Sequence, residues 1–128
     1  MHRRRTRRRC DQRGAAVVDV VLVMVVLVPV VLGILQVALV LFVRNTLASA
    51  ASEGARLAAT RDRGPADGAA LTREQIDGAV SGRFAQDVVA AQQGRTVEVT
   101  VHAQVPALGL GGPAVELTVT GHAVEEPP

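Results

Sequence analysis

Residues 20–43 read VVLVMVVLVPVVLGILQVALVLFV, and this run decides the fold. It has 24 residues without a charged side chain, and 19 of them are Val, Leu, Ile or Phe. As an α-helix it would be about 36 Å long, against about 30 Å for a bilayer hydrocarbon core. Its insertion into lipid is favoured by about 8 kcal/mol. Although eleven of the residues are Val, a single strand cannot satisfy its backbone in lipid, so the sequence predicts one transmembrane helix.

The rest of the composition argues against a compact soluble enzyme. The chain has 128 residues, of which 48% are apolar and only 2% aromatic, and the run above takes much of that apolar share. No Ser/His/Asp, Cys/His, phosphate-loop or paired-carboxylate pattern is visible, and the lone Cys10 makes neither an internal disulfide nor a zinc site by itself. We therefore expect no enzymatic activity, no cofactor and no metal. The sparse aromatic residues offer no stacking surface for nucleic acid, so no nucleic-acid partner is expected.

Charge predicts the orientation of the helix. Residues 1–43 carry seven Arg and two Asp, a net +5, whereas residues 44–128 carry seven Arg and ten acids, a net −3. Seven Arg precede the run and only Arg44 follows it closely. The positive-inside rule therefore places residues 1–14 in the cytoplasm and residues 45–128 outside.

Three residues interrupt the apolar run. Pro29 lacks the amide that would bond one turn back, so a kink is expected there. Gly33 adds flexibility or allows another helix to approach closely. Gln36 is the only polar side chain of the run, and the sequence leaves open whether it bonds to another helix or is merely tolerated.

The junction before the run reads Arg13-Gly14-Ala15-Ala16-Val17-Val18-Asp19. A basic leader, a Gly and an acid five residues later resemble the type IV prepilin cleavage motif. That resemblance implies that a prepilin peptidase cuts after Gly14, that Ala15 becomes the new N-terminus, and that Asp19 pairs with the N-terminus of a neighbouring subunit during assembly. The family usually has Glu at the place of Asp19, and its Flp-type major pilins usually have Tyr at the place of Val20.

A longer stretch, residues 13–62, resembles the TadE-like family of Tad (Flp) pilus assembly proteins. The resemblance rests on the junction, the Pro-containing helix and Ala51-Ser52-Glu53-Gly54-Ala55-Arg56. It implies a pseudopilin-like minor subunit or assembly factor of a Tad pilus or related secretion machine. Such a protein lies in the bacterial inner membrane, with other pilin-like or Tad assembly subunits and a prepilin peptidase as partners. The alternative is a single-pass anchored envelope protein whose external region binds another protein.

A secretory signal peptide is the competing interpretation of the N-terminus. Ala48-Ser49-Ala50 has the small-x-small form for cleavage after Ala50. The run of 24 apolar residues exceeds the about 7–15 of a signal peptide, which favours an anchor.

Small residues continue on the helix beyond Arg44, which is expected to end near Arg61. They form two rows with a spacing of four: Ala50, Gly54 and Ala58, and Ala51, Ala55 and Ala59. Such rows let helices approach closely, as packed subunits would require. An ordinary Ala-rich helix with good intrinsic propensity explains them equally well. We name Gly33, Ala51, Gly54 and Ala55 as the candidate helix-packing residues.

A second amphipathic helix is predicted to follow a linker. Thr72-Arg73-Glu74-Gln75 has the form of a capping box. An apolar stripe then recurs every four residues, at Ile76, Val80, Phe84 and Val88. Gly94 is a plausible C-cap.

Two ten-residue segments, residues 96–105 and 115–124, alternate apolar and polar side chains, which predicts strands. Antiparallel pairing with Val105 opposite Val115 places His122 opposite Glu98 and His102 opposite Thr118. Two His without a further ligand make a weak metal site. The sequence thus predicts an α+β fold: a basic leader (1–14), a long transmembrane helix extending outside the membrane (15–62), a linker (63–71), and an external region (72–128) with the second helix and a C-terminal antiparallel β-hairpin.

Overall fold

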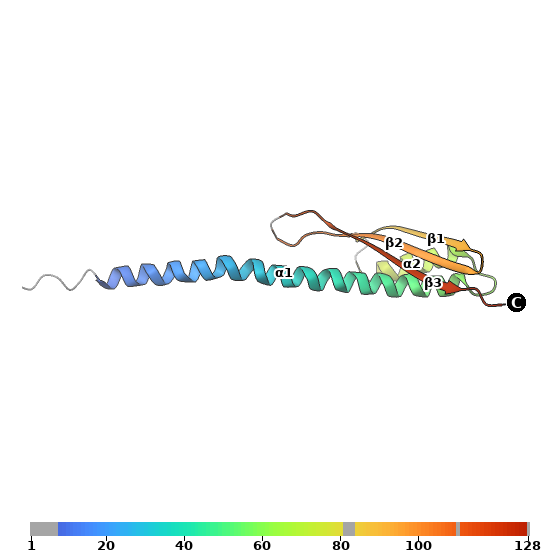
Figure 1. Ribbon diagram of the computed structural model, residues 1–128, viewed down its shortest axis with the longest axis horizontal. Coiled ribbons are helices and arrows are strands. Elements are labelled where there is room, and N and C mark those ends of the chain that lie inside the picture. The colour runs from blue at the N-terminus through green and yellow to red at the C-terminus, as the bar shows by residue number, and fades with distance from the viewer. Residues whose placement is uncertain (1–7, 81–83, 110, 128) are drawn as a thin grey trace, which may run out of the picture. The chain divides into compact units, whose positions relative to one another are not determined.

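The computed structural model describes residues 8–80, 84–109 and 111–127. Its elements, in chain order, are α1 (Arg8–Ala58), α2 (Pro65–Ala79), β1 (Ala85–Gln93), β2 (Thr96–Val105) and β3 (Val115–Val124) (Figure 1). The chain divides into two compact units, Met1–Leu35 and Gln36–Pro128. The α+β class predicted from the sequence is confirmed.

The described part of the first unit is helical and belongs to α1. All residues from 13 to 31 are exposed, including every Val, Leu and Met among them. Among the described residues, α1 is the one helix long and apolar enough to cross a membrane. The helix continues through Pro29. An unbroken apolar helix with no protein cover fits a single-pass membrane protein.

The second unit holds an antiparallel three-stranded sheet of order β1-β2-β3. The two predicted strands are confirmed as β2 and β3, and Val105 lies opposite Val115 as expected. Val97, Val99 and Val101 are at most 1% exposed, whereas the residues between them are half-buried. The strict alternation of Val with polar residues therefore set both the strands and their register.

The sheet has a third strand where the sequence predicted the end of a helix. β1 pairs with β2 from Ala85 opposite Ala103 to Gln93 opposite Thr96. Its residues are mostly Ala and Gln, which have little preference for strands. The strand forms because it gives the backbone of β2 a partner on its second side. Gly94, predicted as a helix C-cap, lies in the β1–β2 turn with a φ of 63°.

The prediction that the second helix starts at Thr72 is wrong, because α2 begins at Pro65. Proline fits the first helical position, and the Gly64 N–H donates a hydrogen bond of 3.0 Å to the Asp67 carboxylate. Residues 65–71 of the predicted linker therefore belong to α2. Of the predicted apolar stripe, Ile76, Val80 and Val88 are buried and Phe84 is partly buried. Only Ile76 lies within α2: Val80 is its C-cap, Phe84 follows it, and Val88 lies on β1. A spacing of four keeps residues on one face in a strand as well as in a helix.

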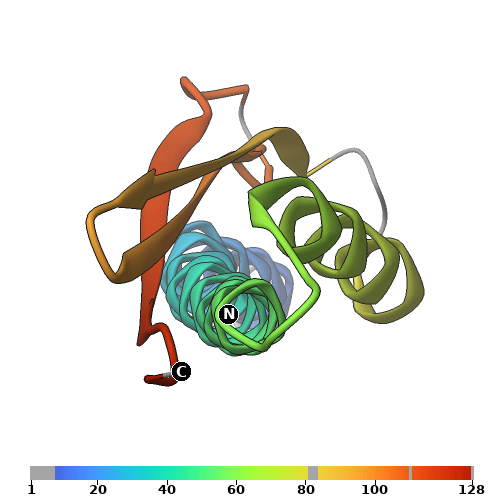
Figure 2. The same cartoon turned by 90° about the vertical axis from the view of Figure 1, so that its right-hand side faces the viewer.

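One face of the sheet covers α1 and α2 within the second unit, and Figure 2 shows the sheet curving around α1 with α2 beside it. The shared core contains residues of all five elements. Val43 and Leu47 of α1 are both 0% exposed in this core. Val43 ends the apolar run assigned above to the membrane, so the run is longer than the part of α1 that is free to contact lipid.

Candidate functional site

The candidate processing residues lie inside α1, six or more residues after its start at Arg8. Gly14, Ala15 and Asp19 are all exposed. Ala15 and Asp19 are four residues apart, so they share one face of the helix. Among the described side chains, no cation lies within ion-pair distance of Asp19. Of the leader, residues 1–7 and the side chains of residues 8–12 lie outside the described part of the chain.

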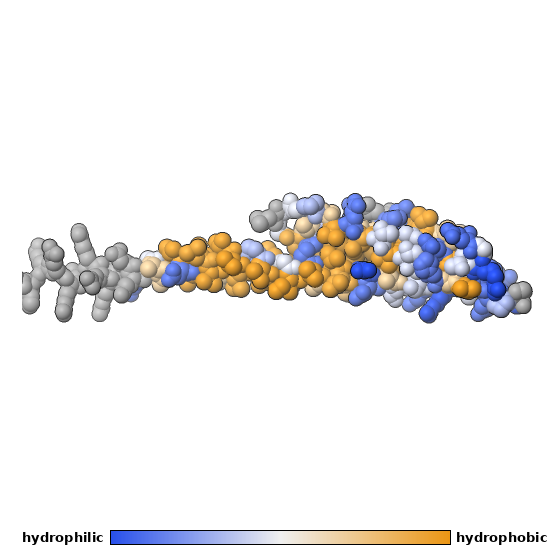
Figure 3. Space-filling view, viewed as in Figure 1, coloured by the Kyte–Doolittle hydropathy of each residue, from blue (hydrophilic) through white to orange (hydrophobic). Residues whose placement is uncertain are grey.

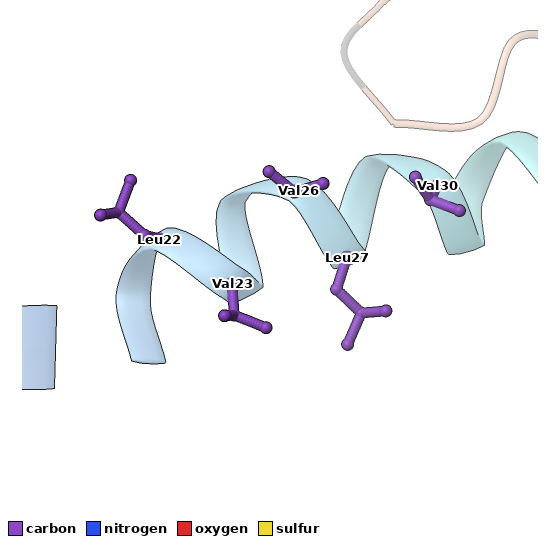
Figure 4. A pocket seen from close by; sticks show the side chains of 5 residues that line it. All are labelled: Leu22, Val23, Val26, Leu27 and Val30. Atoms are coloured by element: carbon purple, nitrogen blue, oxygen red, sulfur yellow. The ribbon is translucent and has the colours of Figure 1, made fainter. Parts of the chain in front are cut away.

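The apolar part of α1 exposes aliphatic side chains on its surface. A shallow depression on the helix is lined by Leu22, Val23, Val26, Leu27 and Val30. In Figure 4, Leu22 and Val26 point to one side of the helix, and Val23 and Leu27 to the other. Gly33 is exposed, and a Cβ placed on it would meet nothing within 4 Å. This surface suits lipid chains or another apolar helix.

Gln36 has a partner inside the second unit. Its Nε2 donates a hydrogen bond of 3.2 Å to the Pro106 carbonyl, and its Oε1 accepts one of 2.7 Å from the Leu108 N–H. Both ends of the amide therefore bind the backbone of the β2–β3 connection. The two interpretations left open by the sequence, a bond to another helix or mere tolerance, are replaced by a contact between α1 and this connection.

The candidate packing residues beyond the apolar run are buried inside the second unit. Ala51 and Ala55 are both 0% exposed, and Gly54 lies where α1 crosses α2. A Cβ placed on Gly54 would collide with the Thr72 hydroxyl and lie 2.6 Å from the Gly68 carbonyl oxygen. In return, a Cβ on Gly68 would lie 2.5 Å from the Gly54 carbonyl oxygen. The two backbones touch only because both residues are glycine.

Thr72 and Gly121 complete the packing around α1. The Thr72 hydroxyl is buried and donates a hydrogen bond of 2.8 Å to the Gly68 carbonyl, and it also lies 3.3 Å from the Ala50 carbonyl. Gly121 brings β3 against α1, because a Cβ there would lie 2.6 Å from the Ala51 carbonyl oxygen. The small residues of α1 thus pack against α2 and β3 of the same chain.

Sequence reasoning missed Gly68, Thr72 and Gly121 as packing residues. The signal for the first two was a row of small residues that recur every four positions, Gly64, Gly68 and Thr72, like the rows noted on the first helix. The signal for Gly121 was a glycine inside an otherwise regular strand, which marks a close approach of another backbone.

The outer face of the sheet carries the two histidines in the predicted register. His122 Nδ1 lies 3.5 Å from a Glu98 carboxylate oxygen, and His102 Nδ1 lies 3.2 Å from the Thr118 hydroxyl. Both histidines are exposed. Within the described residues, no three His, Cys, Asp or Glu side chains gather closely enough to hold a metal ion.

Comparison with known families assigns part of the chain. Residues 14–56 match the family model of TadE-like proteins. The matched segment begins at the candidate processing glycine and ends two residues after Gly54, so it takes in the exposed apolar helix and the α2 crossing. No curated protein and no solved structure matches the chain. The resemblance to TadE-like proteins expected over residues 13–62 is confirmed over residues 14–56.

Proposed function

We propose, from the TadE-like segment at residues 14–56, that the protein is a pseudopilin-like minor subunit or assembly factor of a Tad-type pilus or related secretion machine. The observation that carries the proposal is the family match over the segment that supplies both the exposed apolar helix and the central helix of the external unit. The protein acts by assembly and not by catalysis, without cofactor or nucleic acid. Its partners are other pilin-like or Tad assembly subunits.

Processing is the second part of the proposal. A prepilin peptidase removes residues 1–14, and Ala15 becomes the N-terminus of the mature chain. The Asp19 carboxylate then pairs with the terminal ammonium of a neighbouring subunit. This role is supported by the exposure of Asp19 and by the lack of a cation beside it among the described side chains. A charge near lipid is costly unless it is paired, so such a contact would favour assembly.

The packing of α1 argues against cleavage as a signal peptide after Ala50. Such a cut would separate Val43 and Leu47, both 0% exposed, from the sheet that covers them. The second unit would lose residues 36–50 of its central helix, at a cost of several kcal/mol for these two side chains alone. We therefore propose that α1 stays attached as an anchor in the bacterial inner membrane, with the N-terminus in the cytoplasm.

N-terminal sequencing of membrane-extracted protein, co-produced with a prepilin peptidase, tests this function. The expected N-terminus is Ala15, and Gly14→Leu should block the cut because a large side chain obstructs the peptidase. Gly33→Leu serves as the control, since it adds the same side chain to an open part of α1. An intact Met1 in the wild type would contradict processing and favour the alternative, an anchored envelope protein that binds another partner. A start at Ala51 would favour the signal peptide.

A further inference from the structure

We propose that the external unit rests directly on lipid, through an apolar collar made of Val37, Leu41 and Phe42 of α1 and Leu108 of the β2–β3 connection. The four side chains are 60%, 50%, 57% and 42% exposed, respectively. They belong to one end of the second unit, and no described residue covers them. The occupant of this surface is the acyl region of the outer leaflet.

The first argument is the length of the free helix. Asp19 marks one edge of the apolar run, and the second unit begins at Gln36. The 16 residues from Val20 to Leu35 extend about 24 Å as a helix, which is short of the about 30 Å hydrocarbon core. About four more residues of α1, residues 36–39, must therefore lie in the hydrocarbon core, and Leu41 and Phe42 follow within one turn, at its boundary with the headgroups. All of these residues already belong to the second unit.

The second argument is the pairing of Gln36. An amide at this depth is costly in lipid unless both its donor and its acceptor are satisfied. The Pro106 carbonyl and the Leu108 N–H satisfy it at 3.2 and 2.7 Å. The same two bonds satisfy two backbone groups of the connection and hold Leu108 at the level of Gln36. The connection therefore enters the lipid together with this turn of α1.

The third argument is the distribution of charge along the second unit. Residues 105–115, like residues 20–43, contain no charged side chain. Charged residues gather at the end of the unit that holds the C-terminus, where Arg61, Asp62 and Arg95 are exposed. Figure 3 shows the hydrophilic surface concentrated at that end. A unit with one uncharged apolar end and one charged end suits a boundary between lipid and water.

A single tryptophan reports the contact, because the chain contains neither Trp nor Tyr. Leu108→Trp is prepared in the full chain and reconstituted in phosphatidylcholine vesicles with or without acyl chains brominated near the headgroup. Val26→Trp, within the exposed apolar helix, serves as the control for insertion. Val124→Trp replaces a side chain that is 67% exposed at the opposite end of β3 from Val115, and serves as the control for water.

We expect bromine to cause a loss of Leu108→Trp fluorescence, as it does for Val26→Trp, and to leave Val124→Trp unchanged. Phe42→Trp should also lose fluorescence in the brominated vesicles. This variant tests a second residue of the collar, and it replaces one aromatic side chain by another. Matching circular dichroism spectra show that the variants are folded. The proposal is overturned if Val26→Trp is quenched while Leu108→Trp behaves like Val124→Trp. A blue-shifted but unquenched Leu108→Trp would indicate a protein partner and overturn it equally.

Discussion

Gly54 and Gly68 hold two helices in backbone contact, so that a Cβ on Gly68 would lie 2.5 Å from the Gly54 carbonyl oxygen. The contact joins the TadE-like segment to α2, which lies beyond the family match. The small residues at this crossing therefore hold α2 against α1 within the second unit.

Gly68→Ala should destabilise the external unit by about 1–3 kcal/mol, because the added methyl group separates α1 from α2. Thermal unfolding of the full chain in detergent, followed by circular dichroism, measures the change. Gly78→Ala is the matched control, since a Cβ on this residue of α2 meets nothing within 4 Å. That variant should be as stable as the wild type or more stable by about 0.5–1 kcal/mol. Equal loss in both variants would contradict the crossing.

Val101→Asp should destabilise the unit by several kcal/mol, because it buries a charge at a position that is 0% exposed. Thr120→Asp, on the exposed face of β3, should change stability by less than about 1 kcal/mol. Limited proteolysis of the two variants in membranes distinguishes them. Similar protease resistance would show that the two faces of the sheet do not differ as described.

A reporter enzyme fused after Pro128 should be active only outside the cytoplasm, because the leader carries the excess of Arg. Replacing several of the six Arg within residues 3–9 by Gln should lower the fraction of chains with this orientation. The fraction is measured by protease protection in membrane vesicles. Activity of the wild-type fusion inside the cytoplasm would refute the predicted orientation.

Asp19→Asn should lower co-purification with Tad pilus subunits while leaving membrane insertion unchanged, because it removes the charge proposed to meet a neighbouring ammonium. Asp11→Asn is the control, since the proposed cut removes that residue with the leader. Chemical cross-linking in membranes, followed by immunoblotting, measures both variants. A normal yield of cross-linked product from Asp19→Asn would exclude the proposed pairing.

The hairpin was predictable because its pattern is local. Alternation over ten residues fixes which face of each strand is buried, and the apolar face sets the register of Val105 opposite Val115. β1 was not predictable in this way, since its Ala and Gln side chains carry little signal and its pairing depends on β2. The dense Pro, Gly and Asp residues at the start of α2 were interpreted as a linker. In the structure they begin a helix, and Gly68 is required there by a distant contact with Gly54.

The resemblance to TadE-like proteins over residues 14–56 was accessible from sequence because it depends on order along the chain: a basic leader, Gly14, Asp19 and an apolar run. The partner of Gln36 was not accessible, because it lies 70 residues away in the connection between two strands. Likewise, the contacts of the small residues on α1 could not be inferred until the positions of α2 and β3 were known.

The burial of Val43 and Val119 in one core cluster imposes an order on biosynthesis. The two residues share one core cluster but are 76 positions apart in the chain, so the helix is synthesised long before the strand that covers it. Contacts between such distant segments form late during folding. Until β3 has been synthesised, the nascent chain exposes the apolar side of this part of its helix to water, where chaperones and proteases compete for it. A message truncated before residue 115 would therefore yield a helix without the strand that covers it, which quality-control proteases should remove.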